Sequence, residues 1–180
     1  MLDCEISGLP FMVSNRTAVI FQAGDKATVH RLQDIFEAMA NRCFYLGEFG
    51  SATKMKLLAN MMVAIHNSVA GEVLNMAARI GMDQETVIEV LGPSAGGSVT
   101  FSNKAPIMIS RDFEGGTGPF RHMVHYLDRA SEMAKRAGAA TPLLDKTREC
   151  YQLADKQNRG DQDIAAVIEI LEAASQDPTA

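Results

Sequence analysis

The sequence lacks tryptophan, is poor in aromatic residues (6%) and has only three cysteines among its 180 residues. Cys4, Cys43 and Cys150 are far apart and form no CxxC pair, so they match no zinc or disulfide pattern and favour reduced thiols. The N-terminus has no secretory hydrophobic region, and no unbroken apolar run is long enough to span a bilayer. We therefore expect a soluble, cytoplasmic protein that is not embedded in a membrane.

An excess of positive charge is also lacking. The chain has 17 Lys and Arg residues against 22 Asp and Glu residues, which gives a formal net charge of −5. This balance argues against a protein that binds nucleic acid or an anionic membrane surface in general. The hydrophobic share of 47% and the charged share of 22% are ordinary for a globular protein, and the length suits one sizeable domain or slightly more.

The stretch 47–60 joins a glycine-rich turn to a long apolar helix. Its lysine and asparagine, Lys56 and Asn60, are four residues apart and so share one helix face. Apolar residues recur at steps of three and four along the same helix: Met55, Leu58, Met62, Ile65, Val69, Val73 and Met76. The face of Lys56 is either a partly buried polar site or a solvated flank, since lysine is rarely buried unless it is paired.

This stretch resembles the catalytic signature of the β-hydroxyacid dehydrogenase family, G-x-x-G-x-G-x-x-x-K-x-x-x-N. Gly47, Gly50, Lys56 and Asn60 match the signature, whereas Ala52 replaces its third glycine. We expect the added methyl group to strain the turn mildly. The resemblance implies that Lys56 is the catalytic proton donor and acceptor, because a desolvated ammonium has a pKa nearer the working pH. Asn60 would hold Lys56 and the substrate oxygen in place.

Residues 1–46 do not form a complete domain by themselves. The pattern predicts strands over residues 2–7, 17–21 and 42–46 and a helix over residues 29–39. These elements are too few to bury both faces of a sheet, so we expect them to be the end of a larger one.

The first of these strands, with the residue after it, resembles the family's substrate segment, D-x-x-x-S-G-G. Asp3, Ser7 and Gly8 match the segment, and Leu9 replaces its last glycine. The resemblance implies that Ser7 and Gly8 bind the substrate carboxylate through a hydroxyl and a backbone N–H. Taken alone, Ser7 also suits a hydroxyl that caps its own turn.

The dinucleotide-binding fingerprint G-x-G-x-x-G does not follow any predicted strand in this sequence. The chain begins where the family's nucleotide-binding domain ends. We therefore expect a truncated chain in which residues 1–46 are the C-terminal remnant of a Rossmann cofactor domain.

The remainder, residues 47–180, has the pattern of a helical bundle. Asp83 is a candidate N-cap, residues 92–97 form a loop, and Ser98 starts another helix. Further helices are expected over residues 119–137, from Pro142, and over residues 163–174. The family resemblance implies that Gly97 and Ser98 flank the substrate and donate to its carboxylate, with a plain structural loop as the alternative.

The segment 120–128 resembles the family's F-x-x-x-L-x-x-K-D segment, whose lysine lies near the cofactor. Asp128 is retained and is implied as a cofactor-binding residue, whereas Leu127 replaces the lysine and removes an expected cation. His122 and His125 are three residues apart on the predicted helix. No third ligand stands at a suitable spacing, so we predict no metal site.

These features predict a mainly α fold: a helical bundle like the C-terminal domain of 6-phosphogluconate dehydrogenase, preceded by the last strands and helix of a truncated Rossmann domain. The resemblance implies an NAD- or NADP-dependent oxidoreductase that acts on a small hydroxy acid and forms a homodimer through its long helix. The alternative is a non-catalytic helical dimerisation module with a vestigial or shared site, which Leu9, Ala52, Leu127 and the missing fingerprint favour.

Overall fold

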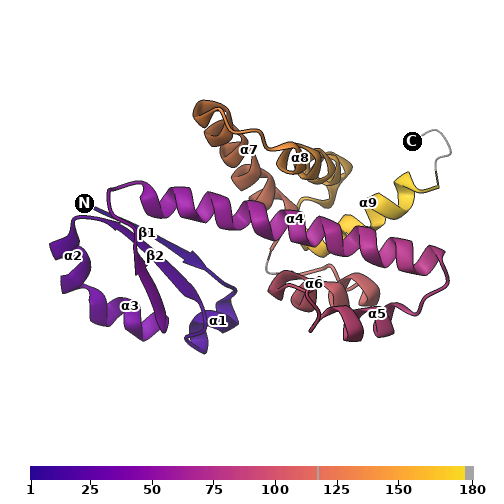
Figure 1. Ribbon diagram of the computed structural model, residues 1–180, viewed down its shortest axis with the longest axis horizontal. Coiled ribbons are helices and arrows are strands. Elements are labelled where there is room, and N and C mark those ends of the chain that lie inside the picture. The colour runs from indigo at the N-terminus through magenta and orange to yellow at the C-terminus, as the bar shows by residue number, and fades with distance from the viewer. Residues whose placement is uncertain (117, 177–180) are drawn as a thin grey trace. The chain divides into compact units, whose positions relative to one another are not determined.

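The structure is a computed structural model that describes residues 1–116 and 118–176. The chain divides into two compact units, Met1–Asn60 and Met61–Ala180, each of which is described by itself. The division falls inside the longest helix, α4 (Ser51–Arg79), which Figure 1 shows as a continuous coil. The first turns of α4 group with the sheet of the first unit because they are bonded to its first strand.

The first unit contains a three-stranded sheet in the order β1-β2-β3. Strand β1 pairs with β2 in antiparallel register, with Ile6 opposite Ile20, and β2 pairs with β3 in parallel register. The bounds are β1 (Leu2–Ser7), α1 (Pro10–Ser14), β2 (Val19–Gly24), α2 (Lys26–Arg31), α3 (Gln33–Met39) and β3 (Arg42–Tyr45). The three strands expected from the sequence are confirmed, with shifted ends for β2 and β3.

The helical region of the first unit differs from the expectation of one helix over residues 29–39. Asp25 caps α2, accepting the N–H of Thr28 at 2.8 Å, and this cap moves the start to Lys26. The backbone leaves the helical region at Leu32 (φ −100°, ψ 7°), which separates α2 from α3. Helix α1 was not expected, although Pro10 at its first position is a sequence signal that could have revealed it.

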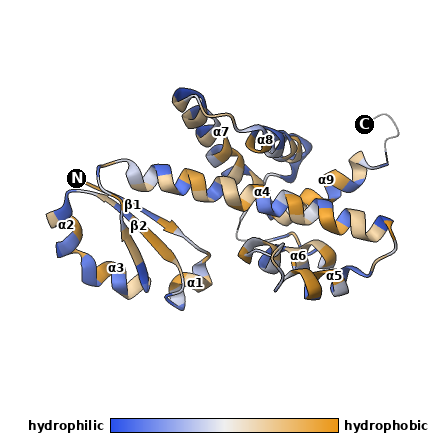
Figure 2. Ribbon diagram, in the orientation of Figure 1, coloured by the Kyte–Doolittle hydropathy of each residue, from blue (hydrophilic) through white to orange (hydrophobic). Residues whose placement is uncertain are grey.

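The core of the first unit lies between the sheet and α3. Ile20, Phe36 and Ala40 are buried there, and Leu2 and Ile6 pack against them. Most of β2 is coloured hydrophobic in Figure 2. Because strand side chains alternate between faces, Asp3 and Ser7 must lie on the face of β1 opposite to Leu2 and Ile6. The polar face of β1 is therefore the one that meets the start of α4.

The second unit is helical, which confirms the mainly α fold. Its elements are the remainder of α4, α5 (Gln84–Leu91), α6 (Val99–Ser110), α7 (Phe120–Ala137), α8 (Pro142–Ala154), a π-helical turn (Asp155–Arg159), a 3-10 turn (η2, Ile164–Ala166) and α9 (Val167–Ala174). Asp83 caps α5 by accepting the N–H of Thr86 at 2.8 Å, as the sequence predicted. The apolar pattern of the helix that starts at Pro142 predicts an inner face that includes Leu143 and Leu153. This prediction is wrong at both positions, since these side chains are 66% and 44% exposed.

Helix α4 is the only helix in the described part of the chain that is long and apolar enough, by length and composition alone, to cross a membrane. Its contacts account for that composition in another way. Asn67 is fully buried, and its amide donates to the hydroxyl of Tyr151 at 2.7 Å and to the carbonyl of Ile164 at 2.8 Å. Leu74 of the same helix is also fully buried. In the second unit, α4 is therefore a core helix that α8 and η2 cover.

A buried ion pair links α6 to the segment that precedes η2. Lys104 and Asp163 are 7% and 1% exposed, and their charged groups are 2.6 Å apart. Asp163 also accepts the N–H of Ala165 at 2.9 Å. A side chain at Gly116 would place its Cβ 2.3 Å from the Cβ of Asp163, so only glycine fits beside the pair. The two charges lie 59 residues apart in the chain, and the sequence analysis identified neither.

We predict that Lys104→Met destabilises the protein by about 3–5 kcal/mol, because it leaves the buried Asp163 carboxylate without its counter-charge. The change is measured as a lower midpoint of urea unfolding. Lys146→Met is the matched control, since Lys146 pairs with Glu149 at the surface with side chains 80% and 65% exposed. Its midpoint should equal that of the unchanged protein. Equal midpoints for both variants would show that the buried pair does not stabilise the fold.

Candidate functional site

Lys56 lies in the second turn of α4 and is half-buried against β1. Its ammonium donates a hydrogen bond to the backbone carbonyl of Ile6 at 2.5 Å. Burial lowers the pKa of Lys56 from its ordinary value of 10.5, while the nearby carboxylate of Glu5 opposes this shift. Of the two alternatives for this helix face, the structure shows the partly buried polar one.

Two glycines shape the turn before α4. Gly47 and Gly50 have φ values of +91° and +94°, a conformation that side chains with a Cβ rarely adopt. Helix α4 begins at the next residue, Ser51, so Ala52 lies within its first turn and is fully buried. The expectation of mild strain at Ala52 is therefore wrong, because alanine is the residue best suited to helical backbone.

The carboxylate of Asp3 attaches this first turn to β1. Its two oxygens accept hydrogen bonds from the backbone N–H of Thr53 at 3.1 Å and from the Thr53 hydroxyl at 2.9 Å. Asp3 and Thr53 are both half-buried. The contact fixes the start of α4 on the polar face of β1, one helical turn before Lys56.

Ser7 is the last residue of β1 and is half-buried. It directly follows Ile6, so the Lys56 ammonium lies at the peptide group between Ile6 and Ser7. Gly8 has φ +153°, and a Cβ there would lie 3.0 Å from the Cβ of Ala18, so this position requires glycine. Leu9 has an ordinary extended backbone (φ −95°, ψ 162°), and this departure from the family pattern leaves the loop unstrained.

Asn60 is 7% exposed and lies one turn after Lys56 on the same helix. The spacing places both side chains on one face of α4. Within the first unit the structure thus brings Lys56 to the Ile6–Ser7 peptide and buries Asn60 one turn further along. The Lys56 nitrogen can hold a proton beside Ser7 and Gly8, the two residues that follow Ile6.

The predicted substrate residues of the second unit are engaged in local structure. The N–H of Gly97 donates to the carbonyl of Ser94 at 2.9 Å, and a Cβ at Gly97 would lie 2.1 Å from the carbonyl oxygen of Gly92. The Ser98 hydroxyl accepts the N–H of Phe101 at 3.0 Å and so caps α6. A hydroxyl that accepts one bond can still donate another, which leaves Ser98 the better of the two candidates for contact with a carboxylate.

Asp128 lies on the exposed side of α7 and connects it to α8. Its carboxylate forms an ion pair with the Arg148 guanidinium at 2.9 Å and accepts a hydrogen bond from Gln152 at 3.0 Å. Leu127, at the family's lysine position, is fully buried together with Phe120. The replacement therefore puts an apolar core residue where the family segment has a cation.

His122 and His125 are both exposed on α7. Within residues 1–116 and 118–176, no cluster of three or more His, Cys, Asp or Glu side chains could hold a metal ion.

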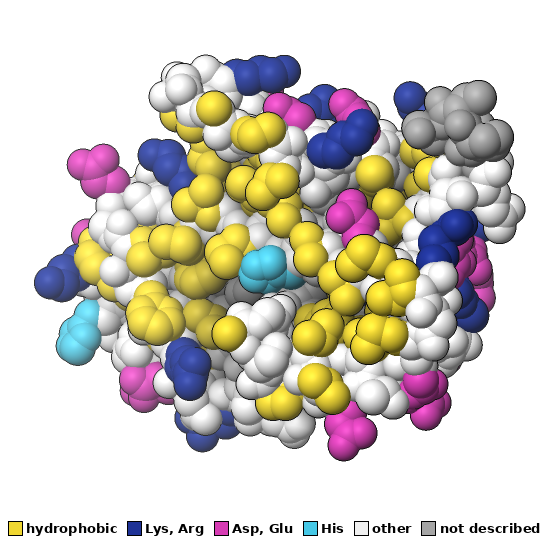
Figure 3. All heavy atoms as spheres, turned by 45° about the vertical axis from the view of Figure 1, so that its right-hand side comes forward, with side chains coloured by type: hydrophobic (Ala, Val, Ile, Leu, Met, Phe, Trp, Pro, Cys, Tyr) yellow, Lys and Arg dark blue, Asp and Glu magenta, His cyan; other side chains and the backbone are white. Residues whose placement is uncertain are grey.

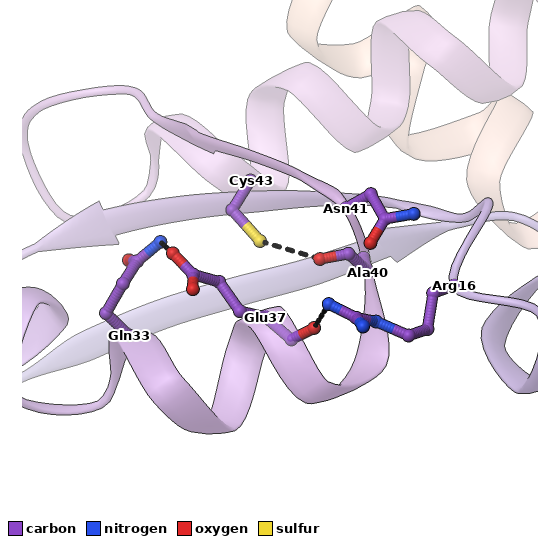
Figure 4. Close-up of a pocket in the computed structure, with 6 residues that line it drawn as sticks. All are labelled: Arg16, Gln33, Glu37, Ala40, Asn41 and Cys43. Carbon is purple, nitrogen blue, oxygen red and sulfur yellow. Dashed lines mark hydrogen bonds between the residues drawn. The ribbon is translucent and has the colours of Figure 1, made fainter.

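A polar pocket of about 280 Å³ opens on the first unit, lined by Arg16, Gln33, Glu37, Ala40, Asn41 and Cys43 (Figure 4). Its groups bond to one another: Arg16 donates to the Glu37 carbonyl at 2.6 Å, and Gln33 donates to the Glu37 carboxylate at 2.8 Å. Cys43 lines this pocket, whereas none of the predicted catalytic, substrate-binding or cofactor-binding residues does. The pocket is lined by residues from the turn before β2 and from α3 and the segment that follows it.

Residues 50–171 match the family model described as the NAD-binding part of NADP-dependent 3-hydroxyisobutyrate dehydrogenase. The chain is 28% identical over 173 residues to glyoxylate/succinic semialdehyde reductase 2 of Arabidopsis thaliana, covering 96% of this chain and 48% of the relative. It is 30% identical over 166 residues to the cytokine-like nuclear factor N-PAC of Anopheles gambiae, covering 92% of this chain and 29% of that protein. The chain thus spans about half or less of the length of these relatives.

Among solved structures, 3-hydroxyisobutyrate dehydrogenase of Salmonella typhimurium aligns with a TM-score of 0.89 at 23% identity, over 94% of this chain and 60% of that one. The Mycobacterium tuberculosis 3-hydroxyisobutyrate dehydrogenase aligns with a TM-score of 0.82 at 24% identity, again over 94% and 60%. These likenesses confirm the fold. Because the family model matches more than half of the chain, the chain belongs to the β-hydroxyacid dehydrogenase family, whose cofactor is NAD or NADP.

Proposed function

We propose that this chain is the substrate-binding and dimerisation part of an NAD- or NADP-dependent oxidoreductase that acts on a small hydroxy acid. The observation that carries this proposal is the half-buried Lys56 ammonium, 2.5 Å from the Ile6 carbonyl and beside Ser7. A lysine with a lowered pKa releases its proton more readily than an exposed lysine does, which suits a group that takes and returns protons. The matched family contains reductases and dehydrogenases for such substrates.

In the oxidative direction the Lys56 amine takes the proton of the substrate hydroxyl, and a hydride leaves the carbon that bears this hydroxyl. The bound nicotinamide supplies the hydride acceptor. In the reductive direction the Lys56 ammonium returns the proton to the carbonyl oxygen. Asn60 holds the oxygen that reacts, and Ser7 and Gly8 bind the carboxylate beside it.

Gly97, Ser98 and Asp128 complete the proposed set in the second unit. We assign Ser98, whose hydroxyl also caps α6, to substrate binding, and Asp128, which pairs with Arg148, to cofactor binding, as the family resemblance implies. The G-x-G-x-x-G turn that cradles a pyrophosphate is not in this sequence.

The competing proposal is a non-catalytic dimerisation module. Relatives include a protein named as a nuclear factor as well as one named as a reductase, so family membership alone does not distinguish the two functions. The buried Leu127 favours the non-catalytic module, because it removes a cation from the site. The desolvated Lys56 favours the enzyme, because a dimerisation surface has no use for a half-buried amine.

We predict that Lys56→Ala lowers kcat by about 10²–10⁴-fold, the usual contribution of a general acid or base. Turnover is measured in a form of the protein that carries a nucleotide-binding half. Lys54→Ala is the matched control, because Lys54 lies two residues away and points about 160° around the helix. The control should leave kcat unchanged, and equal effects at both lysines would refute the assignment.

The pH dependence of turnover provides a further prediction. Oxidation needs the neutral Lys56 amine, so its kcat should rise with pH and level off above the pKa of Lys56, which lies below 10.5. Reduction needs the ammonium, so its kcat should fall over the same pH range. Both dependences should disappear in Lys56→Ala. A profile that does not change in this variant would assign the titration to another group.

Residues 1–180 alone should bind NAD and NADP too weakly to measure by calorimetry. The reason is the missing pyrophosphate turn, which normally supplies backbone N–H donors at a helix N-terminus. Micromolar affinity of this chain for either nucleotide would contradict the prediction and would place the main nucleotide site within these residues.

We further propose that the chain forms a homodimer through α4. Met62, Val69 and Met76 are seven residues apart on this helix and are 57%, 50% and 60% exposed. A stripe with this spacing suits packing against the same helix of a second copy. Hydrophobic side chains also gather on the face drawn in Figure 3.

Val69→Glu should convert the dimer to a monomer, because two carboxylates would face each other across the symmetric interface. Light scattering at micromolar concentration measures the mass. Leu143→Glu on α8, where the leucine is 66% exposed, is the control and should stay dimeric. A monomeric mass for the unchanged protein would exclude the dimer.

A further inference from the structure

Helix α4 has no N-cap side chain of its own. Gly50, the residue before it, has a φ of +94° that favours glycine and therefore carries no side chain. The first N–H groups of a helix have no partner within the helix, and a side-chain oxygen just before it usually accepts one of them. Because Gly50 has no side chain, the residue just before α4 cannot supply this side-chain oxygen.

Asp3 supplies the missing cap from a distant part of the chain. It precedes Thr53 by 50 residues and accepts both the Thr53 N–H (3.1 Å) and the Thr53 hydroxyl (2.9 Å). Its negative charge also lies at the positive end of the α4 dipole. The contact therefore sets where α4 begins relative to β1.

The contacts of Asp3 and Ile6 with α4 follow the same register along the chain. Asp3 meets Thr53 and Ile6 meets Lys56, so each contact joins residues that are 50 positions apart. Three residues span about 10 Å along a strand but about 4.5 Å along a helix. The long Lys56 side chain spans this difference and reaches the Ile6 carbonyl.

We propose that Asp3 is a positioning residue that holds Lys56 against the Ile6–Ser7 peptide, and that it does so through Thr53. The inference rests on the proposed role of Lys56 in proton transfer. Asp3 belongs to the segment that the family resemblance links to substrate. Here both of its carboxylate oxygens accept hydrogen bonds from Thr53, which assigns it to the helix start.

The test is the pKa of Lys56 in the 180-residue chain, measured from the pH dependence of its acetylation by mass spectrometry. Asp3→Ala removes both contacts, and the released Lys56 becomes hydrated, so its pKa should rise toward 10.5. Each unit of rise lowers the neutral fraction, and hence the labelling rate at pH 8, about tenfold. Loss of the Asp3 charge by itself would shift this pKa downward, so a rise reports movement of the helix.

Two milder variants keep the test decisive if Asp3→Ala does not fold. Thr53→Val removes the hydroxyl contact and keeps the N–H contact, so it should give a smaller rise. Asp3→Asn should give no rise, because its amide can accept the Thr53 N–H and donate to the hydroxyl, while loss of the charge by itself lowers the pKa of Lys56.

The matched control is Asp25→Ala. Asp25 caps α2 with the same pair of contacts, to the N–H of Thr28 at 2.8 Å and to its hydroxyl at 2.6 Å. This variant loses an equivalent cap in the same unit and should leave the pKa of Lys56 unchanged. An unchanged pKa in folded Asp3→Ala or Thr53→Val, or an equal rise in Asp25→Ala, would overturn the proposal.

The two proposals fail in different ways. If Lys56→Ala leaves turnover unchanged while Asp3→Ala raises the Lys56 pKa, the catalytic role is wrong and the positioning role stands. If Lys56→Ala abolishes turnover while the Asp3 and Thr53 variants leave the pKa unchanged, Lys56 is catalytic and something other than Asp3 positions it.

Discussion

The placement of the Lys56 ammonium against the Ile6 carbonyl is the constraint on which the candidate site depends. Removing an ammonium from water is unfavourable, and the contacts of this half-buried group, among them the one with the Ile6 carbonyl, compensate for only part of that loss. The result is the lowered pKa of Lys56. The contact requires α4 to begin at a defined position along β1. The glycine turn and Asp3 together set that position. The position of the proposed catalytic group thus depends on backbone geometry and on one carboxylate, that of Asp3, which precedes Thr53 by 50 residues.

Helix α4 serves each unit with a different part of its length. In the first unit its polar start is bonded to β1 through Thr53 and Lys56. In the second unit it supplies Asn67, whose buried amide donates to Tyr151 and to Ile164. The Lys56 ammonium and the Asn67 amide each donate to an acceptor on another element. Low-dielectric surroundings make such partners necessary for buried polar groups. Its apolar composition follows from this central position.

The sequence predicted those features whose signals are local. Strand β1, the Asp83 cap and the start of α8 at Pro142 follow from alternation, capping chemistry and the fixed φ of proline. The pairs Lys104–Asp163 and Asp3–Thr53 could not be read in this way, because each joins residues 50 or more positions apart. Lys56 itself was found through a family signature, and its burial came only from the structure. Leu143 and Leu153 show the converse error, since apolar residues can remain exposed.

The environments of Leu127 and Lys56 argue in opposite directions about catalysis, and their physical costs differ. A buried leucine on α7 stabilises the fold, so its presence is explained by packing alone. A half-buried lysine is less favourable for stability than an unbranched apolar side chain of similar length. The apolar side chain would fill the same space without desolvating a charge. Residues that break such a rule without a structural gain are expected at functional sites. Packing therefore accounts for the leucine at the position of the family's lysine, whereas the half-buried amine of Lys56 supports the proposed role in proton transfer.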